Sequence, residues 1–208
     1  MNLKAVIFDY GGVLCALPDF SQIEACARVA GLERDEFWKW FWNFRLAYDR
    51  GDISERRFWK SIGEANGRVY SDAQVDELIR HEVNFYLTLD ETMLAWNRTL
   101  RASGYKTAML SNLPEPLGLH LRRHHMRLLE EFDVVTLSYE VRSAKPEAKI
   151  YLHTVERLGV AAGETLFLDD KATNVQAALA LGLQAVEFVS RAQFAGREAE
   201  YGLPALAV

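Results

Sequence analysis

Two short apolar segments of this chain each end in carboxylates. Residues 4–8 run into Asp9, and residues 165–168 run into Asp169 and Asp170. Short, continuously apolar runs are typical of strands buried on both faces of a parallel sheet. Ligands of open α/β sheets bind at the carboxyl ends of such strands, and carboxylate oxygens suit Mg²⁺. The two segments therefore predict a magnesium site at one edge of a parallel sheet.

Strand-like and helix-like segments alternate over the second half of the chain. Further strands are predicted at 106–110, 134–137 and 184–188, with helical stretches between them. Strands that alternate with helices form parallel sheets with right-handed crossovers. The fold class is therefore α/β.

Residues 20–88 interrupt this alternation with a helical, aromatic block of about four predicted helices and no strand. Phe37, Phe41, Phe44 and Tyr48 recur at steps of three and four, which predicts one face of one helix. We expect the block to be an insertion after the first strand. The predicted core is then 1–16 plus 90–208, with an α-helical cap at 17–89.

Several polar residues predict where helices begin. Ser54 is a predicted N-cap, and Ser71 followed by Gln74 is typical of a capping box. Pro146 suits the first turn of the helix that follows it. These signals fix helix starts rather than function.

Composition excludes some classes of protein. The chain is 50% hydrophobic and 25% charged, and it carries a net charge of −5 without a long basic run. Nucleic acid is not an expected partner, since binding it needs a clustered basic face. No apolar run approaches the ~20 residues of a membrane-spanning helix, and Lys4 directly before a short strand does not resemble a signal peptide. The two cysteines, Cys15 and Cys26, form no disulfide framework, so a cytoplasmic location is expected.

Two further motifs can bind a phosphoryl group. Ser111 and Asn112 end the predicted strand at 106–110, where a hydroxyl and amides can donate to phosphoryl oxygens. Lys145 precedes a helix start, where its charge opposes the helix dipole unless an anion lies between them. Taken singly, Ser111-Asn112 also fits an ordinary turn, and Lys145 also fits a lysine exposed to solvent.

Taken together and in order, the motifs resemble the haloacid dehalogenase-like hydrolase superfamily. The resemblance covers nearly the whole chain, including a helical cap between the first and second motifs. The forms Asp-Tyr-Gly-Gly-Val-Leu, Ser-Asn-Leu-Pro and Leu-Asp-Asp are similar to one phosphatase branch of the superfamily. That branch includes the bacterial α-D-glucose-1-phosphate phosphatase and the phosphatase domain of soluble epoxide hydrolase. The resemblance implies a Rossmann-like core with strand order 5-4-1-2-3.

The resemblance also implies a role for each motif residue. Asp9 would be the nucleophile and would form an aspartyl-phosphate. Mg²⁺ would be held by Asp9, the Gly11 carbonyl and Asp170, with Asp169 close by. The phosphoryl group and the shell around the metal would be held by four further residues: Ser111, Asn112, Lys145 and Asn174. The implied substrate is a small phosphorylated metabolite, first of all a sugar phosphate such as glucose 1-phosphate.

Gly11 departs from the family pattern, because most of these phosphatases carry a second aspartate there to protonate the leaving group. Losing such an acid typically costs on the order of 10²–10⁴ in rate. One reading is a substrate with a good leaving group. A second is another acid, for which Asp19, His120, His124 and His125 are candidates, although each fits a surface residue better. A third is a catalytically weakened protein that binds phosphorylated ligands or a partner. A dehalogenase also lacks that acid, but Asp169-Asp170 argues against one.

The cap is unusually aromatic, and substrate would be selected there. Its large rings can line a pocket or simply fill the core of a small helical domain, and for any single ring we favour the core. Arg45 can reach a substrate anion, but an exposed arginine is the expectation. A monomer and a homodimer both stay open. The large aromatic residues of the cap are Trp38, Trp40, Phe41, Trp42, Phe44 and Trp59.

Overall fold

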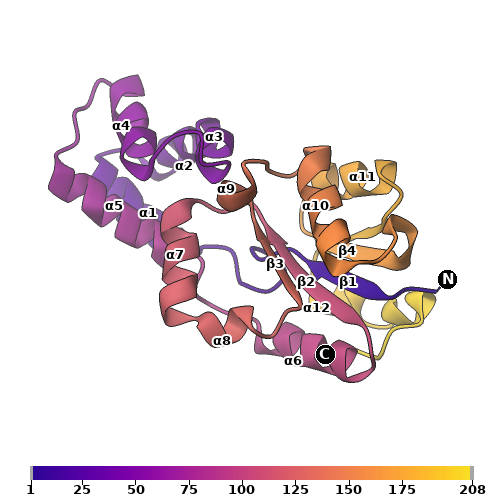
Figure 1. Ribbon diagram of the computed structural model, residues 1–208. Coiled ribbons are helices and arrows are strands. Elements are labelled where there is room, and N and C mark those ends of the chain that lie inside the picture. Colours follow the sequence, from indigo (N-terminus) through magenta and orange to yellow (C-terminus); the bar gives the residue numbers. More distant parts are fainter. Residues whose placement is uncertain (1, 207–208) are drawn as a thin grey trace.

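The computed structural model describes residues 2–206, and a five-stranded parallel sheet lies at its centre (Figure 1). The strand order β3-β2-β1-β4-β5 is the predicted order read from the other edge. All five predicted strands are present within a residue of their expected ends. They are β1 (Ala5–Phe8), β2 (Lys106–Ser111), β3 (Val134–Leu137), β4 (Thr165–Asp169) and β5 (Gln184–Glu187).

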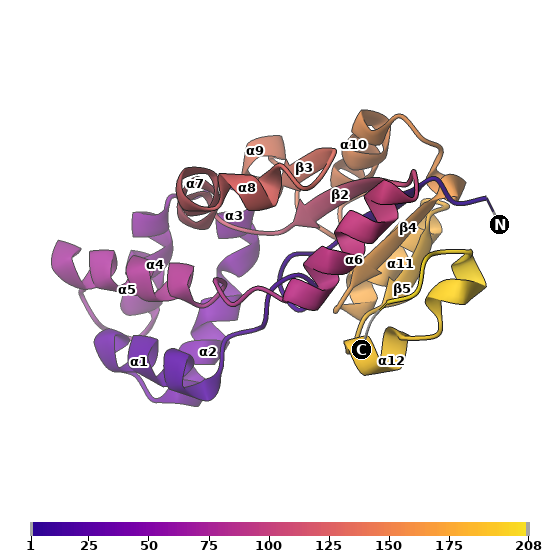
Figure 2. The ribbon, with the colours of Figure 1, turned by 90° about the horizontal axis from the view of Figure 1, so that it is seen from below.

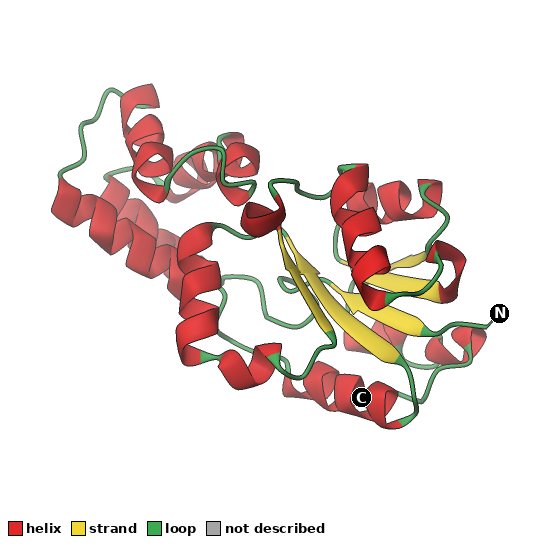
Figure 3. Ribbon diagram, in the orientation of Figure 1, coloured by secondary structure: helices red, strands yellow, loops and turns green. Residues whose placement is uncertain are grey.

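Helices cover both faces of the sheet (Figure 3). Strand side chains alternate between the faces, so Val6 and Phe8 pack on one side and Ala5 and Ile7 on the other. Helices α6 (Glu91–Ala102) and α12 (Arg191–Phe194) cover the first side, and α10 (Ala148–Leu158) and α11 (Ala172–Ala180) the second (Figure 2). Burial on both faces explains why the strands read as continuous apolar runs.

The remaining core elements are short. A single predicted helical stretch at 115–130 is two helices, α7 (Glu115–His124) and α8 (Met126–Leu129), with a break at His125. The one-turn helix α9 (Ser138–Val141) follows β3 directly and was not predicted. Two 3₁₀ turns, η1 (Ala162–Glu164) and η2 (Glu198–Tyr201), complete this part.

Five helices lie between β1 and α6, grouped beside the sheet rather than on its faces (Figures 1 and 2). The prediction of about four was one too few, because the aromatic segment breaks at Phe44, whose backbone (φ −104°, ψ 0°) leaves the helical region. Phe37 and Tyr48 therefore belong to different helices. The helices are α1 (Phe20–Ala30), α2 (Arg34–Asn43), α3 (Arg45–Asp49), α4 (Glu55–Ala65) and α5 (Asp72–Asn84).

The helix starts are mostly as predicted. The Ser54 side chain accepts from the amide of Arg57, and Ser71 and Gln74 form the expected capping box. The expectation for Pro146 was wrong: α10 begins two residues later, at Ala148, and Pro146 lies in the preceding loop. No helix among the described residues is long and apolar enough to cross a membrane.

Two adjacent chain segments connect the cap helices to the sheet. The amide of Ala16 donates to the carbonyl of Thr88 (2.8 Å), and that of Asp90 donates to Leu14 (2.9 Å). The Ser138 hydroxyl adds a third link, because it donates to the Asp49 carbonyl (2.5 Å) in α3 and accepts from the Leu113 amide (3.0 Å) after β2. The Ser138 bridge holds α3 beside the carboxyl end of β2. The domain limits 17–89 stay a prediction.

Candidate active site

The carboxyl ends of β1, β2 and β4 bring the predicted site residues together. Ser111 and Asp169 are the last residues of their strands, and Asp9 directly follows β1. Since Phe8 pairs with Leu168 across the parallel ladder, the next residues, Asp9 and Asp169, emerge side by side. One carboxylate oxygen from each of Asp9, Asp169 and Asp170 lies within 4.8 Å of the others.

Lys145 supplies a buried positive charge between two of these acids. Its Nζ lies 2.7 Å from Asp9 Oδ1 and 2.7 Å from Asp169 Oδ2, and it donates to the Leu110 carbonyl at 3.0 Å. Burial would lower the pKa of Lys145, but the charges of Asp169 and Asp9 outweigh it and raise that pKa. Lys145 therefore stays an ammonium, and it neutralises carboxylates rather than meeting an anion at the start of α10.

Asn112 holds the Lys145 backbone in place. Its Nδ2 donates to the Lys145 carbonyl (2.8 Å), and its Oδ1 accepts from the Lys145 amide (2.7 Å). The side-chain amide of Asn112 is thus engaged, and its direct effect is to position the lysine.

Asp169 is held on every side. Its Oδ1 accepts from the Lys171 amide and from Asn174 Nδ2, both at 2.9 Å, and its Oδ2 accepts from Lys145. Burial opposes ionisation, but the ammonium of Lys145 and these donors lower the pKa of Asp169. Asp169 is therefore a fixed carboxylate with few free lone pairs, and Asn174 orients it.

Asp9 and Asp170 keep oxygens free. Asp9 Oδ1 accepts from the Tyr10 amide (2.7 Å), whereas no hydrogen bond within residues 2–206 reaches its Oδ2. Burial, with Asp169 and Asp170 nearby, raises the pKa of Asp9 to about 8. Asp170 lies against Gly12, where a Cβ would come within 2.8 Å of the Asp170 Cγ, so only glycine leaves room for this carboxyl.

This donor set fits a divalent cation. Three acids share one ammonium, so the ionised cluster carries an excess of negative charge. Burial and the Asp169 charge raise the pKa of Asp170 as well. Hard oxygen ligands of this kind suit Mg²⁺.

A cavity of about 450 Å³ opens above the acids. Its floor contains Asp9, Gly11, Ser111, Lys145 and Asp170, and its walls come from both the cap and the core. The Lys171 ammonium lies 4.5 Å from the centre of the Trp42 ring, so a residue of the core contacts the cap across it. Trp38 and Trp42 line the cavity, whereas Phe41 and Trp59 are buried in the cap core.

The expectation for Arg45 was wrong, because it is buried, with 4% of its surface exposed, and lines the cavity. Its Nε lies 2.7 Å from Asp49 Oδ1, and its Nη1 donates to Glu82 Oε1 at 2.5 Å. Burial raises the pKa of Glu82 to about 7. Burial also raises the pKa of Asp49. The spacing of Arg45 and Asp49 by four residues was a visible signal. Glu82 had none, since only folding brings it to Arg45.

None of the candidate substitutes for the missing acid lies in the cavity. Asp19 is the exposed N-cap of α1, and His120, His124 and His125 group together on α7 and just after it. The carboxyl that does line the cavity, outside the acid cluster, is that of Asp49.

Comparison with known proteins assigns the family. The sequence profile of the haloacid dehalogenase-like hydrolases matches residues 3–182. The chain belongs to the haloacid dehalogenase-like hydrolase family. Within it, the chain falls in the phosphatase branch: it is 29% identical over 183 residues to the sesquiterpene phosphatase astK of Aspergillus oryzae, with 88% of each chain covered. It is 23% identical to a D-ribitol-5-phosphate phosphatase of Bacteroides thetaiotaomicron, with 88% of this chain and 90% of that protein covered.

Solved structures agree with this assignment. A haloacid dehalogenase-like enzyme of Bacteroides thetaiotaomicron superposes with a TM-score of 0.74 at 25% identity, covering 89% of this chain and 93% of that one. A structure of the same enzyme in complex with magnesium and inorganic phosphate has a TM-score of 0.71 at 26% identity. The predicted family and fold are thus confirmed, and the chain is a haloacid dehalogenase-like phosphatase.

Proposed function

We propose that the protein hydrolyses a phosphomonoester with Mg²⁺ and that Asp9 is the nucleophile. The observation that carries the proposal is the free Oδ2 of Asp9 at the floor of a cavity, beside a buried ammonium and two more carboxylates. Asp9, Asp170 and the Gly11 carbonyl would hold the metal. When bound, Mg²⁺ supplies charge that offsets the negative phosphoryl oxygens.

The chain's own residues account for the remaining steps. Asp9 Oδ2 would attack phosphorus while the bond from phosphorus to the alcohol oxygen breaks, which leaves an aspartyl-phosphate and an alkoxide that takes a proton from solvent, since Gly11 supplies none. Water then attacks the same phosphorus, releasing phosphate and restoring Asp9. Ser111 would donate to the phosphoryl oxygens, and Lys145 would offset their charge.

The structure and the relatives are compatible with more than one class of substrate, and each class is included in the test below. Glucose 1-phosphate, the first guess from the sequence, fits Gly11 because an anomeric oxygen leaves with less proton assistance. The names of the relatives add sesquiterpene phosphates and D-ribitol 5-phosphate. The cytoplasmic location and the oligomeric state stay predictions.

Phosphate release tests the proposal. The panel contains acetyl phosphate, p-nitrophenyl phosphate, glucose 1-phosphate, glucose 6-phosphate, D-ribitol 5-phosphate and farnesyl phosphate, each with Mg²⁺ and with EDTA. We expect release that needs the metal and is lost in Asp9→Asn, while Asp72→Asn on the exposed start of α5 behaves as the unchanged protein. Release that persists in Asp9→Asn would overturn the nucleophile.

A second candidate function rests on Gly11. Without a proton donor at this position the protein can be a weakened enzyme that binds phosphorylated ligands or a partner. Binding of inorganic phosphate with Mg²⁺, together with no turnover across the whole panel, would favour this candidate.

A further inference from the structure

The cavity above the acids has two chemically different ends. Its floor is polar, as described above. The cap contributes nine lining residues, and six of them are apolar: Leu17, Pro18, Ile23, Trp38, Trp42 and Leu46. A phosphoryl group bound at the floor would therefore direct its alcohol portion toward an apolar wall.

Part of this wall is exposed to solvent. Leu17 is 56% exposed, Leu46 50% and Trp42 40%, and all three line the same cavity although they come from different cap segments. Single exposed apolar side chains are ordinary, but a contiguous group of them marks a binding surface. An apolar ligand that covered these side chains would remove them from water, which is favourable.

The wall offers little to a polyhydroxyl ligand. The polar side chains that the cap brings to the cavity, within the part of the chain that the structure describes, are Arg45, Asp49 and Tyr86. Arg45 already contacts Asp49 and Glu82, so neither its guanidinium nor the Asp49 carboxylate is free of a charged partner. Tyr86 from the cap and Lys171 and Thr173 from the core are the polar side chains left for a ligand beyond the floor. The several hydroxyls of a buried sugar would find few partners there for the water they lose, and such a loss is unfavourable.

Resting on the proposed phosphatase function, we propose that the substrate is the phosphomonoester of an apolar alcohol, aliphatic or aromatic, rather than a sugar or polyol phosphate. Trp42 and Leu46 contact its hydrocarbon portion. The cavity, at about 450 Å³, lies in the range of sites that hold small molecules.

The test compares esters whose leaving groups match. n-Hexyl phosphate and sorbitol 6-phosphate are both six-carbon primary alkyl phosphates, so a difference in kcat/KM reports the cavity wall rather than the leaving group. We expect n-hexyl phosphate to be at least 10-fold better. In the series ethyl, butyl, hexyl and octyl phosphate, kcat/KM should rise by up to about fourfold for each added methylene. The kcat/KM values of phenyl and 2-naphthyl phosphate test whether the cavity also prefers aromatic alcohols.

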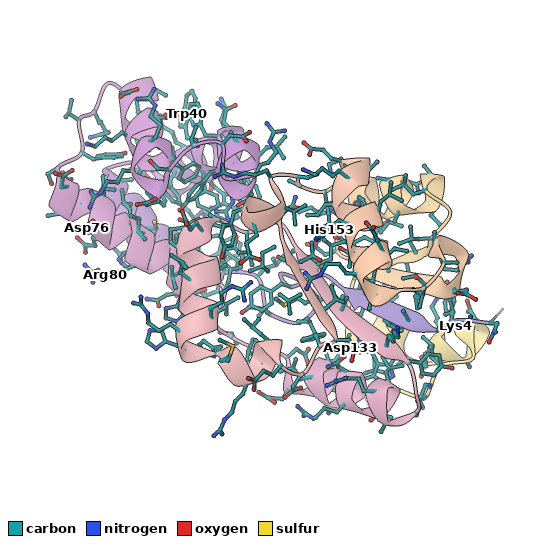
Figure 4. All side chains as sticks on the ribbon, in the orientation of Figure 1. Lys4, Trp40, Asp76, Arg80, Asp133 and His153 are labelled. Carbon is teal, nitrogen blue, oxygen red and sulfur yellow. The ribbon has the colours of Figure 1, made fainter. Side chains whose placement is uncertain are left out.

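Two tryptophans on α2 give a matched pair of variants. Trp42 lines the cavity, whereas Trp40 stacks on Phe44 outside it and lies on the upper side of the cap helices in Figure 4. Trp42→Ala should lower the ratio of hexyl phosphate to acetyl phosphate turnover by about 10-fold, and Leu46→Ala should flatten the chain-length series. Trp40→Ala should leave both unchanged, with a melting curve to show that each variant is folded.

Acetyl phosphate separates the two proposals, because it has almost no hydrocarbon portion. If acetyl phosphate is cleaved with Mg²⁺ but sorbitol 6-phosphate equals or exceeds n-hexyl phosphate, the apolar substrate class is wrong and the phosphatase stands. If Trp40→Ala and Trp42→Ala act alike on the chain-length series, the contact with the wall is wrong. If no phosphate is released from any ester, including acetyl phosphate, the proposed function itself fails.

Discussion

At the scale of single residues, two adjacent glycines in the site have opposite constraints. A Cβ at Gly12 would lie 2.8 Å from Asp170, and its φ of +80° disfavours other residues. A Cβ at Gly11 would have its nearest neighbours, in Leu17 and Tyr86, at 3.8 Å. Position 11 therefore has room for a side chain, and the missing acid is absent for a reason other than space.

This room makes Gly11→Asp an informative variant. We expect it to fold normally and to raise kcat at least about 10-fold for alkyl phosphates, which need a proton on the departing oxygen. p-Nitrophenyl phosphate should gain much less, because its leaving group is a weak base. The measurement is kcat against leaving-group basicity, with Gly12→Ala as an inactive contrast. An equal change for both ester types would contradict a role for proton transfer.

A second residue-scale prediction concerns Glu82. Burial raises its pKa from 4.5 to about 7 in the folded protein, so between these pH values the folded state binds more protons than the unfolded state. Glu82 should therefore lower the free energy of unfolding as pH rises through this window, by up to about 3 kcal/mol, in addition to the fall that the raised pKa of Asp9 causes.

Urea denaturation at several pH values measures this fall. Glu82→Gln should make the fall shallower, because glutamine does not titrate, while the part that Asp9 causes remains. An unchanged slope in Glu82→Gln would show that other groups cause the pH dependence.

At the scale of elements, close contacts fix how helices pack around the site. Helix α7 begins just after the Ser111-Asn112 loop, and at Gly118 a Cβ would lie 2.3 Å from the Tyr139 ring in α9. A larger residue would displace the Tyr139 ring or force the two helices apart. This contact brings α9 close to the loop, where Ser138 can bridge Leu113 and Asp49.

Gly118→Ala should therefore destabilise the protein by about 1–3 kcal/mol, as overpacking of a core does. Gly163→Ala is the control, because its Cβ would find no atom closer than 3.8 Å. The midpoint of urea denaturation measures both. A Gly118→Ala midpoint equal to that of the control would mean that Tyr139 moves aside freely.

At the scale of the whole molecule, the site links segments far apart in the chain. Asp9 follows β1, Lys145 lies in the loop before α10, and Asp169 ends β4, yet they meet as one buried cluster. Because the cluster carries an excess of negative charge, a divalent cation that binds it should stabilise the entire fold.

We expect Mg²⁺ at about 100 times its dissociation constant to add about 2.7 kcal/mol of stability and to raise Tm by about 5–10 °C. Thermal melts with Mg²⁺ and with EDTA measure the shift. Asp170→Asn should reduce it sharply, whereas Asp19→Asn, which keeps an exposed N-cap, should retain it. An equal shift in both variants would place the metal elsewhere.

The sequence by itself determined the sheet and the residues at its carboxyl edge. Both follow from short apolar runs that end in Asp9 and Asp169, and such patterns are local along the chain, whereas the strand order was implied by the resemblance to the family. Only the tertiary structure decided that Phe44 breaks the aromatic helix, that Arg45 is buried with Glu82, and that Trp42 rather than Trp40 faces the cavity. Those outcomes depend on which cap face packs against the core, and contacts between distant segments set that, whereas a helical period shows only which residues share a face.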